Sequence, residues 1–330
     1  MDIQLRAELL NQLGTYMLSD DSDWQHVINS AYHKNSWFTP EFIELSAQNI
    51  ANNFLTIDVL QQLINHYHLD NNISPKKIGV VMAGNIPMVG FHDLLCVFIS
   101  GHKQIIKLSS KDDVLLKHLV EKLYELNSEV KNYITIEESL KNCDAYITTG
   151  SNSSAEIFKQ YFSKYPNIIR KNRTSVALLN GKEDSHQLFK LSEDIHLFFG
   201  KGCRNVTHLY VPENYDFIPL INSFSKFNYF SDHYKYKNNY DFQLSLVLMN
   251  KKFYMTNGST LVLESDSLFP PPSVLYYSYY KDENFINDIL INEDVQCVIG
   301  TNHIPFGEAQ KPQIFNYADG VDTMQFLLTL

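Results

Sequence analysis

The sequence has few cysteines, and they form no cluster. The four cysteines, at positions 96, 143, 203 and 297, stand far apart, with no C-x-x-C spacing and no histidine grouped beside them. This spacing argues against a zinc site and against a disulfide framework. Cys96, Cys143 and Cys297 each lie in an apolar run, where a thiol behaves as a small hydrophobic side chain. Cys203 differs, because Gly, Lys, Arg and Asn surround it.

Long apolar runs and an excess of basic residues are also lacking. No window reaches eighteen uninterrupted apolar residues, and the opening MDIQLRAELLNQLG lacks the basic start and apolar run of a signal peptide. A soluble, cytoplasmic protein without a membrane span is therefore expected. The formal net charge of -10 repels phosphate backbones, so nucleic acid is not an expected partner. With 330 residues, 44% of them hydrophobic, the chain can build two domains with buried cores.

The pattern of apolar residues changes near Lys76. Residues 1–70 show helical spacing and predict several helices. From Lys76 onward, short β-rich runs alternate with helical segments, which we expect at 87–100, 111–126 and 153–164. This alternation predicts βαβ units and a doubly wound parallel sheet of the kind that binds nucleotides.

A second α/β unit is expected in the second half of the chain. It begins with a helix near 184–199, which Asp184 or Ser185 caps, and continues through the turn that carries Cys203. Further along, the sequence predicts a hairpin with a two-residue turn at Asn257-Gly258 and a helix near 282–290. The apolar C-terminal end needs covering, so we expect it to pack on another domain or on a second subunit.

Small and polar residues follow the first predicted strand, at the edge where parallel sheets bind ligands. In VMAGNIPMVG, residues 81–90, Ala83 and Gly84 end the β-rich run and Asn85 precedes Pro87. Two interpretations of Asn85 are open. Its side chain donates a hydrogen bond to an oxygen that becomes anionic during a reaction, or it caps the following helix. The usual G-x-G-x-x-G fingerprint of dinucleotide-binding folds is absent.

The next two strands end in the same way. Lys107 ends a buried strand, and Ser109 and Ser110 follow it at a place that suits a ribose or a phosphate. Without a ligand, such a lysine is an ordinary solvated strand end. Gly150 and Ser151 repeat the geometry after a third strand, where helix capping alone accounts for the serine. No metal is expected, because no set of ligating side chains has the required spacing.

Cys203 lies in LFFGKGCRNV, on a glycine-bounded turn beside Lys201 and Arg204. Neighbouring cations favour the thiolate, which is the nucleophilic form. No His-Asn or His-Asp pair stands at protease-like spacing, which favours a cysteine that takes up an acyl group and passes it to a hydride donor. From the residues alone, catalysis and a purely structural turn remain equally open.

Taken in order, these stretches resemble the aldehyde dehydrogenase superfamily, in particular its acyl-CoA reductase branch of the LuxC type, from about Lys76 to the end. The resemblance implies two three-layer α/β domains, a Rossmann-type cofactor domain and a catalytic domain, with a helical N-terminal lead-in and a C-terminal strand extension. It implies that Cys203 is the nucleophile and that Asn85 and the Cys203 backbone N–H form the oxyanion hole. The implied cofactor-binding residues are Ala83, Gly84, Lys107, Ser109, Ser110, Gly150, Ser151 and Glu264.

Three departures from the family pattern bear on the expected activity. Residues 170–173 offer no carboxylate where oxidative relatives carry a general base, so hydrolysis of a thioester on Cys203 should be slow. Ser110 stands where NAD-preferring relatives often carry Glu, which leaves both NADPH and NADH open as cofactors. The segment that holds the nicotinamide ribose has no clean equivalent, because Glu264 and Asp266 compete for its acidic position.

The implied reaction is reduction of an acyl-CoA or acyl-protein thioester to an aldehyde, with a Cys acyl-enzyme and hydride from NADPH or NADH. One alternative is an oxidative aldehyde dehydrogenase, against which the missing base argues. The other is a catalytically silent protein of the same fold that holds an acyl chain for a partner enzyme. An acyl-donating partner enzyme remains open. So does a homo-oligomer, because the C-terminal strand pairs across subunits in relatives.

We expect domain boundaries near residues 173 and 308. Residues 1–173 hold the helical lead-in and the cofactor-binding domain, and residues 174–308 form the catalytic domain with the nucleophile. Residues 309–330 form the C-terminal extension, which packs on the cofactor domain or on a second subunit.

Overall fold

A computed structural model of the protein describes residues 1–72, 74–281 and 285–330. The chain forms two units: unit 1 comprises residues 1–172 and 312–330, and unit 2 comprises residues 173–311. The boundaries expected near 173 and 308 lie within a few residues of these limits. The C-terminal segment belongs to unit 1.

Helices open unit 1, as the apolar periodicity predicts. They are α1 (Ile3–Met17), α2 (Ser22–Lys34), α3 (Pro40–Phe54) and α4 (Ile57–His66). Each begins with a side chain that accepts a hydrogen bond from a first-turn backbone N–H; these caps are Asp2, Asp21, Thr39 and Thr56. Pro40 occupies the first turn of α3, where a missing N–H breaks no helical hydrogen bond.

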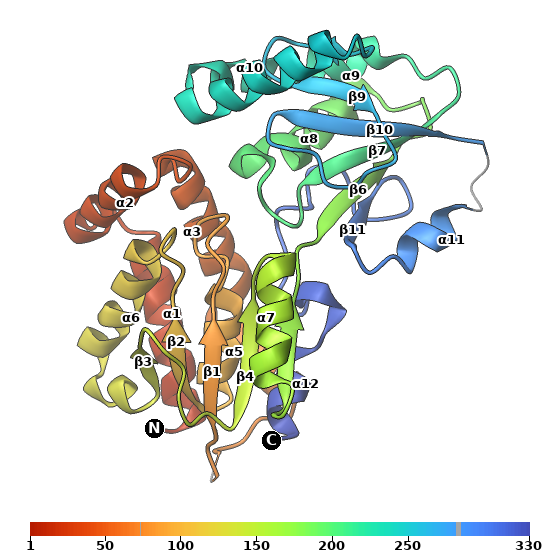
Figure 1. The fold of residues 1–330 in the computed structure, drawn as a ribbon. Coiled ribbons are helices and arrows are strands. Elements are labelled where there is room, and N and C mark those ends of the chain that lie inside the picture. Colours follow the sequence, from red (N-terminus) through yellow and green to blue (C-terminus); the bar gives the residue numbers. More distant parts are fainter. Residues whose placement is uncertain (73, 282–284) are drawn as a thin grey trace. The chain divides into compact units, whose positions relative to one another are not determined.

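The five-stranded sheet of unit 1 is parallel and has the order β3-β2-β1-β4-β5 (Figure 1). Its strands are β1 (Lys77–Val81), β2 (Lys103–Lys107), β3 (Ile134–Ile136), β4 (Ala145–Thr149) and β5 (Asn167–Arg170). The chain moves outward from β1 through β2 to β3 and then returns to place β4 on the other side of β1. This reversal creates a topological switch point at the carboxyl ends of β1 and β4, where doubly wound sheets bind ligands.

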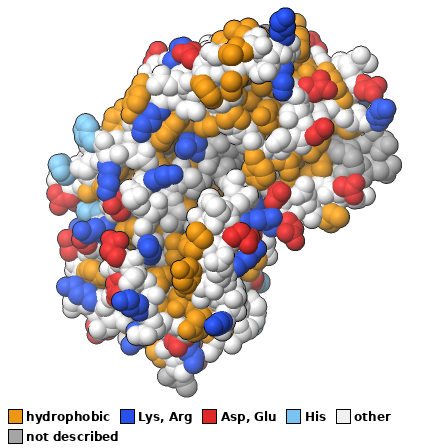
Figure 2. Space-filling model, viewed as in Figure 1, with side chains coloured by type: hydrophobic (Ala, Val, Ile, Leu, Met, Phe, Trp, Pro, Cys, Tyr) orange, Lys and Arg blue, Asp and Glu red, His pale blue; other side chains and the backbone are white. Residues whose placement is uncertain are grey.

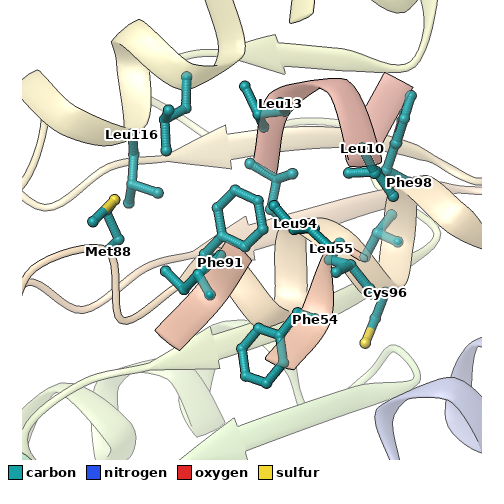
Figure 3. Packing of buried hydrophobic residues seen from close by; sticks show 14 of the residues in the cluster. Leu10, Leu13, Phe54, Leu55, Met88, Phe91, Leu94, Cys96, Phe98 and Leu116 are labelled. Carbon is teal, nitrogen blue, oxygen red and sulfur yellow. The ribbon is translucent and has the colours of Figure 1, made fainter. Parts of the chain in front are cut away.

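Helices cover both faces of this sheet. They are α5 (Phe91–Ile99), α6 (Val114–Leu126) and α7 (Asn152–Phe162), with the short 3-10 helix η1 (Ser128–Asn132) after α6. Figure 3 shows residues of the core on one face, and Leu10 of α1, Leu94 of α5 and Leu116 of α6 belong to this one buried cluster. On the other face, Tyr146 of β4 stacks on Phe162 of α7 with ring centroids 4.0 Å apart. Unit 1 therefore has three layers.

α5 starts later than the expected position at residue 87. Met88 has a left-handed backbone, with φ of 55°, which a helix cannot include. Its backbone N–H donates to the Asp112 carboxylate at 2.6 Å, and this long-range contact holds the irregular turn. α5 begins only at Phe91, after Gly90 in the N-cap position.

The expectation of a C-terminal strand is wrong, because residues Thr323–Leu328 form a helix, α12, after the short 3-10 helix η4 (Ala318–Gly320). Met324 and Leu327 are spaced by one helical turn and are both buried. The Asp322 side chain accepts a hydrogen bond from the Gln325 backbone N–H and starts the helix. Residues 309–330, all of which the structure describes, contain no strand that could pair across subunits.

A buried ion pair fastens α12 to the sheet of unit 1. Arg170, the last residue of β5, donates to Asp93 of α5 at 2.6 Å and to Thr323 of α12 at 2.8 Å. Both charged side chains are buried, with Arg170 only 3% exposed. Burial alone would lower the pKa of Arg170, but the charge and hydrogen bond of Asp93 raise it above its ordinary value.

The six-stranded sheet of unit 2 has the order β11-β6-β7-β10-β9-β8, parallel except for β8. Its strands are β6 (Thr174–Leu178), β7 (Val206–Pro212), β8 (Met255–Thr256), β9 (Leu261–Glu264), β10 (Val274–Tyr280) and β11 (Val295–Ile299). The expected two-residue hairpin turn is wrong, because Thr256 pairs with Leu261 and leaves a longer loop between them. The Asn257 side chain accepts from the backbone N–H groups of Ser259 and Thr260, and these bonds favour the longer loop.

Helices also cover the sheet of unit 2. They are α8 (Ser185–His196), α9 (Phe217–Ser223), α10 (Tyr234–Met249) and α11 (Phe285–Leu290), with the 3-10 helices η2 (Leu197–Gly200) and η3 (Phe224–Asp232). Of the two predicted caps for α8, Asp184 is the one observed, in a capping box with Gln187. Val262 of β9 belongs to the core that α8 and α9 form, whereas its neighbour Leu261 packs with Tyr240 of α10.

The helix expected near 282–290 is observed as α11, and residues 282–284 lie outside the described residues. The two α/β units with their largely parallel sheets confirm the predicted fold class.

Charged side chains of both signs are interspersed on the face of the molecule that Figure 2 shows. This mixing leaves no broad field of a single sign on that face. In the part of the chain that the structure describes, no helix combines the length and apolar character that crossing a membrane requires.

Candidate functional site

The structure brings most of the predicted cofactor-binding residues of unit 1 to one edge of its sheet. Val81, the last residue of β1, pairs with Lys107 of β2 on one side and with Thr148 of β4 on the other. The loops that follow these strand ends carry Ala83, Gly84, Ser109, Ser110, Gly150 and Ser151. This is the edge, next to the switch point, where ligands bind in doubly wound folds.

Gly84 lies directly against the loop after β2. A Cβ atom on Gly84 would lie 2.7 Å from Ser109 Oγ and 3.2 Å from Asp112 Cβ. Because real Cβ atoms do not approach other atoms so closely, only glycine fits here without displacing the serine. The loops after β1 and β2 therefore form one packed surface.

Asp112 supports this surface from below, and the sequence analysis missed it. Its side chain is only 2% exposed, and its Oδ2 atom accepts the Met88 backbone N–H at 2.6 Å. Burial raises the pKa of Asp112 well above its usual range. Ser46 of α3 also donates to the Pro87 carbonyl at 2.8 Å, so the turn after Asn85 is held from two sides.

Asn85 itself is half-buried at the start of this turn. The alternative that it caps the next helix is wrong, because the N-cap position of α5 is Gly90, with no side-chain cap. Its predicted role in stabilising an anionic oxygen stays a prediction.

The remaining residues of this edge are solvent-facing. Lys107 and Ser110 are exposed, and Ser109 is half-buried. Ser151 is the N-cap of α7, and its hydroxyl accepts the Ser154 backbone N–H at 3.2 Å. A Cβ atom on Gly150 would lie 2.8 Å from Ser154 Cβ, so this loop also approaches its helix too closely for a side chain.

Cys203 lies in unit 2, on the turn between η2 and the amino end of β7, and is half-buried. The turn follows three consecutive left-handed residues, Phe198, Phe199 and Gly200, with φ of 57°, 56° and 69°. For the two phenylalanines this conformation costs about 1–2 kcal/mol each. Packing opposes that cost, because the Phe199 ring lies 4.4 Å from the Phe230 ring between centroids.

Polar side chains hold the backbone of this turn through hydrogen bonds. Ser175 Oγ of β6 donates to the Cys203 carbonyl at 3.0 Å. Asn205 Oδ1 accepts the Gly202 backbone N–H at 2.7 Å, and its Nδ2 donates to the Leu197 carbonyl at 2.8 Å. Neither Ser175 nor Asn205 was predicted from the sequence. The only local signal was an asparagine two positions after the cysteine.

Arg204 faces a different thiol from the one expected. Its guanidinium lies 3.3 Å from Cys297 Sγ and 3.5 Å from the Ala309 carbonyl. Burial raises the pKa of Cys297, and the Arg204 charge opposes that shift. Cys297 is therefore a buried thiol beside a cation, as distinct from the half-buried Cys203.

Comparison with solved structures gives the superfamily fold. Aldehyde dehydrogenase 21 from Physcomitrella patens, in complex with the product succinate, is similar with a TM-score of 0.66 at 12% identity, over 92% of this chain and 74% of that one. An aldehyde dehydrogenase from Mycobacterium tuberculosis, complexed with NAD+, gives 0.65 at 12% identity, over 94% and 75%. An E. coli NADP-dependent enzyme gives 0.64 at 10% identity, over 91% and 73%.

The sequence comparison supports one branch of this superfamily. Residues 61–218 match the family described as acyl-CoA reductase (LuxC), a segment that includes both Asn85 and Cys203. Together with the shared fold, this match supports an assignment to the LuxC-type branch of the aldehyde dehydrogenase superfamily. The family match and the similar structures support an oxidoreductase. No curated protein matched the sequence.

The predicted site residues are divided between the two units. Asn85 and the carboxyl edge of β1, β2 and β4 belong to unit 1, and Cys203 belongs to unit 2. Glu264 also belongs to unit 2, where it ends β9 with an exposed side chain. The region 170–173, where the resemblance places the base of oxidative relatives, contains Arg170 in its ion pair with Asp93.

Two buried titratable groups lie on α8, just before the turn that carries Cys203. Asp194 accepts the backbone N–H groups of Gly307 at 2.6 Å and Ala309 at 3.1 Å, and burial raises its pKa to about 7. His196 Nε2 lies 3.0 Å from Thr260 Oγ1, its ring stacks on Phe227, and burial lowers its pKa to about 4. His196 is therefore a neutral structural residue at pH 7.

The two groups should affect stability with opposite signs on acidification. In the unfolded chain this histidine has a pKa of 6.5, whereas folded His196 stays neutral until about pH 4. Its contribution to the free energy of unfolding is therefore present in full above pH 6.5 and is lost as the pH falls through 4. Between pH 7 and pH 5 this loss amounts to about 2 kcal/mol. Asp194, with its pKa raised, contributes stability at low pH that is lost as the pH rises toward 7.

We therefore compare the unfolding free energy of His196→Gln with that of wild type at two pH values. The difference, variant minus wild type, should rise by about 2 kcal/mol when the pH falls from 7 to 5. Asp194→Asn should shift with the opposite sign and is the matched control. Chemical denaturation at both pH values measures the differences. Equal differences at the two pH values would contradict the assignment of a buried neutral imidazole.

Proposed function

We propose that this protein reduces an acyl-CoA or acyl-protein thioester to an aldehyde, by way of an acyl group on Cys203 and hydride from a nicotinamide cofactor. The observation that carries the proposal is a half-buried cysteine on a rigidly held turn, inside the segment that matches the acyl-CoA reductase family. A purely structural cysteine would not need a turn built from left-handed residues.

In the proposed reaction, the Cys203 thiolate attacks the carbonyl carbon of the thioester. A new C–S bond forms, the bond to the carrier sulfur breaks, and the carrier leaves as a thiolate. The Asn85 amide and the Cys203 backbone N–H stabilise the anionic oxygen of the tetrahedral intermediate. When hydride then reaches the acyl carbon, the bond to Cys203 breaks, the thiolate is restored and the aldehyde leaves.

The carboxyl edge of unit 1 fits a nicotinamide dinucleotide. Gly84 and Gly150 let the loops of this edge pack closely, because a Cβ atom on either would collide with Ser109 or Ser154. This edge lies next to the switch point, where doubly wound folds bind ligands. The exposed Lys107 and the hydroxyls of Ser109 and Ser110 are suited to a ribose, and the first turn of α7 after Ser151 is suited to a pyrophosphate. When bound, the cofactor supplies a hydride to the acyl carbon.

The proposed choice of nicotinamide cofactor rests on Ser110. A carboxylate at this position would bond the ribose hydroxyls and repel a 2′-phosphate, whereas a serine repels neither form. The exposed Lys107 adds a positive charge at the same edge. We propose NADPH, with NADH as the alternative. Among the similar structures, one was solved with NAD+ and another is described as NADP dependent.

The proposed direction of the reaction, reduction and not oxidation, rests on the state of the carboxylate near Arg170. Asp93, a carboxylate close to that region, is buried in its ion pair with Arg170. A paired, buried carboxylate is poorly suited to activate water. The acyl group on Cys203 should therefore survive long enough to be reduced, which favours the reductase over the oxidative alternative.

A labelled long-chain acyl-CoA tests the proposal. We expect a hydroxylamine-sensitive label that mass spectrometry locates on Cys203, and its discharge as aldehyde when NADPH or NADH is added. Cys143→Ala, which removes a buried thiol of unit 1, should label as wild type does. Absence of label, or discharge as the free acid, would contradict the reductase. A label that never discharges would identify an acyl-holding protein instead.

Replacing Asn85 by alanine should slow acylation of Cys203 by about 10²–10³-fold, because one donor to the developing anionic oxygen is lost. The KM for acyl-CoA should change little, since that donor acts mainly in the transition state. Rapid-quench measurement of the label gives both quantities. Asn65→Ala, at an exposed position in α4, is the control. Acylation of Asn85→Ala within threefold of wild type would rule out this role.

A further inference from the structure

The buried side chain of Asn205 holds the backbone of the turn that carries Cys203. Asn205 is 0% exposed. Oδ1 accepts the Gly202 backbone N–H at 2.7 Å, and Nδ2 donates to the Asp194 carbonyl at 3.0 Å and the Leu197 carbonyl at 2.8 Å. The amide thus joins the end of α8, Leu197 at the start of η2 and the residue before Cys203.

This bonding pattern needs an amide of this length. The acceptor faces an N–H group and the donors face carbonyl groups, so Asp would place an oxygen against two carbonyls. Leu would leave the Gly202 N–H and the carbonyls unsatisfied in a buried place. The backbone of Asn205 takes part as well, because its N–H donates to the Gly202 carbonyl at 3.1 Å.

A second contact fixes Cys203 from the side of the sheet. Ser175 of β6 is also 0% exposed, and its Oγ donates to the Cys203 carbonyl at 3.0 Å. The Ser175 backbone N–H donates to the Asn205 carbonyl at 3.1 Å. The peptide groups before and after Cys203 are therefore tied to two rigid elements, α8 and β6.

We propose that Asn205, assisted by Ser175, is a positioning residue for the nucleophile. It holds the turn so that the Cys203 thiol and the Cys203 backbone N–H keep the directions that attack and oxyanion stabilisation require. Asn205 acts through the backbone and does not touch the substrate, because it is wholly buried. The proposal rests on the proposed function, since it assumes that Cys203 is the nucleophile.

The expected effect follows from the sensitivity of bond-forming steps to small displacements. A misplacement of about 1 Å can slow a reaction by about 10²-fold without weakening substrate binding. Asn205→Ala should therefore lower kcat by about 10–100-fold and leave the KM for acyl-CoA within about threefold. Ser175→Ala, a smaller change, should lower kcat by about 3–10-fold with the same KM pattern.

The control must separate positioning from a general loss of stability. Leu220→Ala in α9 removes a fully buried side chain of the unit 2 core and should destabilise that unit without touching the turn. Assayed well below its melting temperature, it should keep the wild-type kcat. If Leu220→Ala loses as much kcat as Asn205→Ala, or if Asn205→Ala keeps a kcat within threefold of wild type, the proposal is wrong.

Alkylation of Cys203 by iodoacetamide, followed by mass spectrometry, gives a readout that does not depend on acyl transfer. In Asn205→Ala the half-buried thiol should react at least about threefold faster than in wild type, because the turn is no longer held. Leu220→Ala should match wild type. A wild type that takes no acyl label would defeat the proposed function alone, whereas unchanged alkylation in both Asn205→Ala and Ser175→Ala would defeat the positioning role. If Asn205→Ala does not fold, Ser175→Ala decides both measurements.

Discussion

Cys203→Ala should form no acyl-enzyme and should produce aldehyde at least about 10⁴-fold more slowly than wild type. The reason is chemical, because the variant lacks the atom that forms the covalent bond to the acyl group. The fold should survive, since the Ser175 hydroxyl bonds the backbone carbonyl of Cys203 and not its sulfur. Hydroxylamine-sensitive labelling and aldehyde release measure the loss, and thermal melting verifies the fold.

Cys203→Ser sharpens this prediction. A serine needs a neighbouring base to become nucleophilic at neutral pH. His196 is stacked and hydrogen-bonded within the core, and His208 bonds the Ser267 carbonyl and the Ser278 hydroxyl, so neither is placed for that task. We therefore expect the serine variant to be as inactive as the alanine variant. Full labelling of Cys203→Ala would show that another residue is the nucleophile.

If that happened, Cys297 would be the first residue to examine. It is the thiol beside Arg204 in unit 2, and its backbone pairs with Ser175, the residue that contacts Cys203. Its pKa is raised by burial, which disfavours the thiolate at neutral pH. Wild-type labelling of Cys297→Ala would therefore complete the assignment to Cys203.

Much of the fold could be predicted from the sequence because its signals are local. The strand ends at Val81, Lys107 and Thr149 follow β-rich runs and precede small residues, and a parallel sheet brings such ends to one edge. Capping by Asp184 also depends on neighbouring residues alone. These features need no knowledge of distant contacts.

The features that the sequence did not reveal depend on contacts between distant residues. The left-handed Met88 delays α5 because the carboxylate of Asp112 holds its backbone N–H. The C-terminal segment is a helix because Met324 and Leu327 bury one face, and a short apolar run does not distinguish that pattern from a strand.

The same limit applies to the candidate site. Cys203 could be selected because its neighbours in the sequence are polar, in contrast to those of the other cysteines. Asn205 and Ser175 could not, because each acts on a partner that only the folded unit 2 brings near. Arg204 was expected beside the Cys203 thiol because the two residues are adjacent in the sequence. In the structure its side chain reaches Cys297 instead.

Arg170→Ala should destabilise unit 1 by about 3–5 kcal/mol. The substitution leaves the Asp93 carboxylate, which is 7% exposed, buried without its cation, and it removes the bond from Arg170 to Thr323 of α12. Chemical denaturation measures the loss, and hydrogen exchange of the α12 amides should report earlier opening of that helix. Lys159→Ala, which removes an exposed helical ion pair with Glu156, is the control and should cost under about 1 kcal/mol.

The double variant Arg170→Met with Asp93→Leu separates two explanations of this loss. If the cost of Arg170→Ala comes mainly from an unpaired buried charge, replacing both partners by apolar side chains should recover most of the stability. The coupling energy from the double-mutant cycle should then exceed about 1 kcal/mol. A double variant as unstable as Arg170→Ala would instead mean that the bond to Thr323, and the docking of α12 that depends on it, carries the stability of this corner of unit 1.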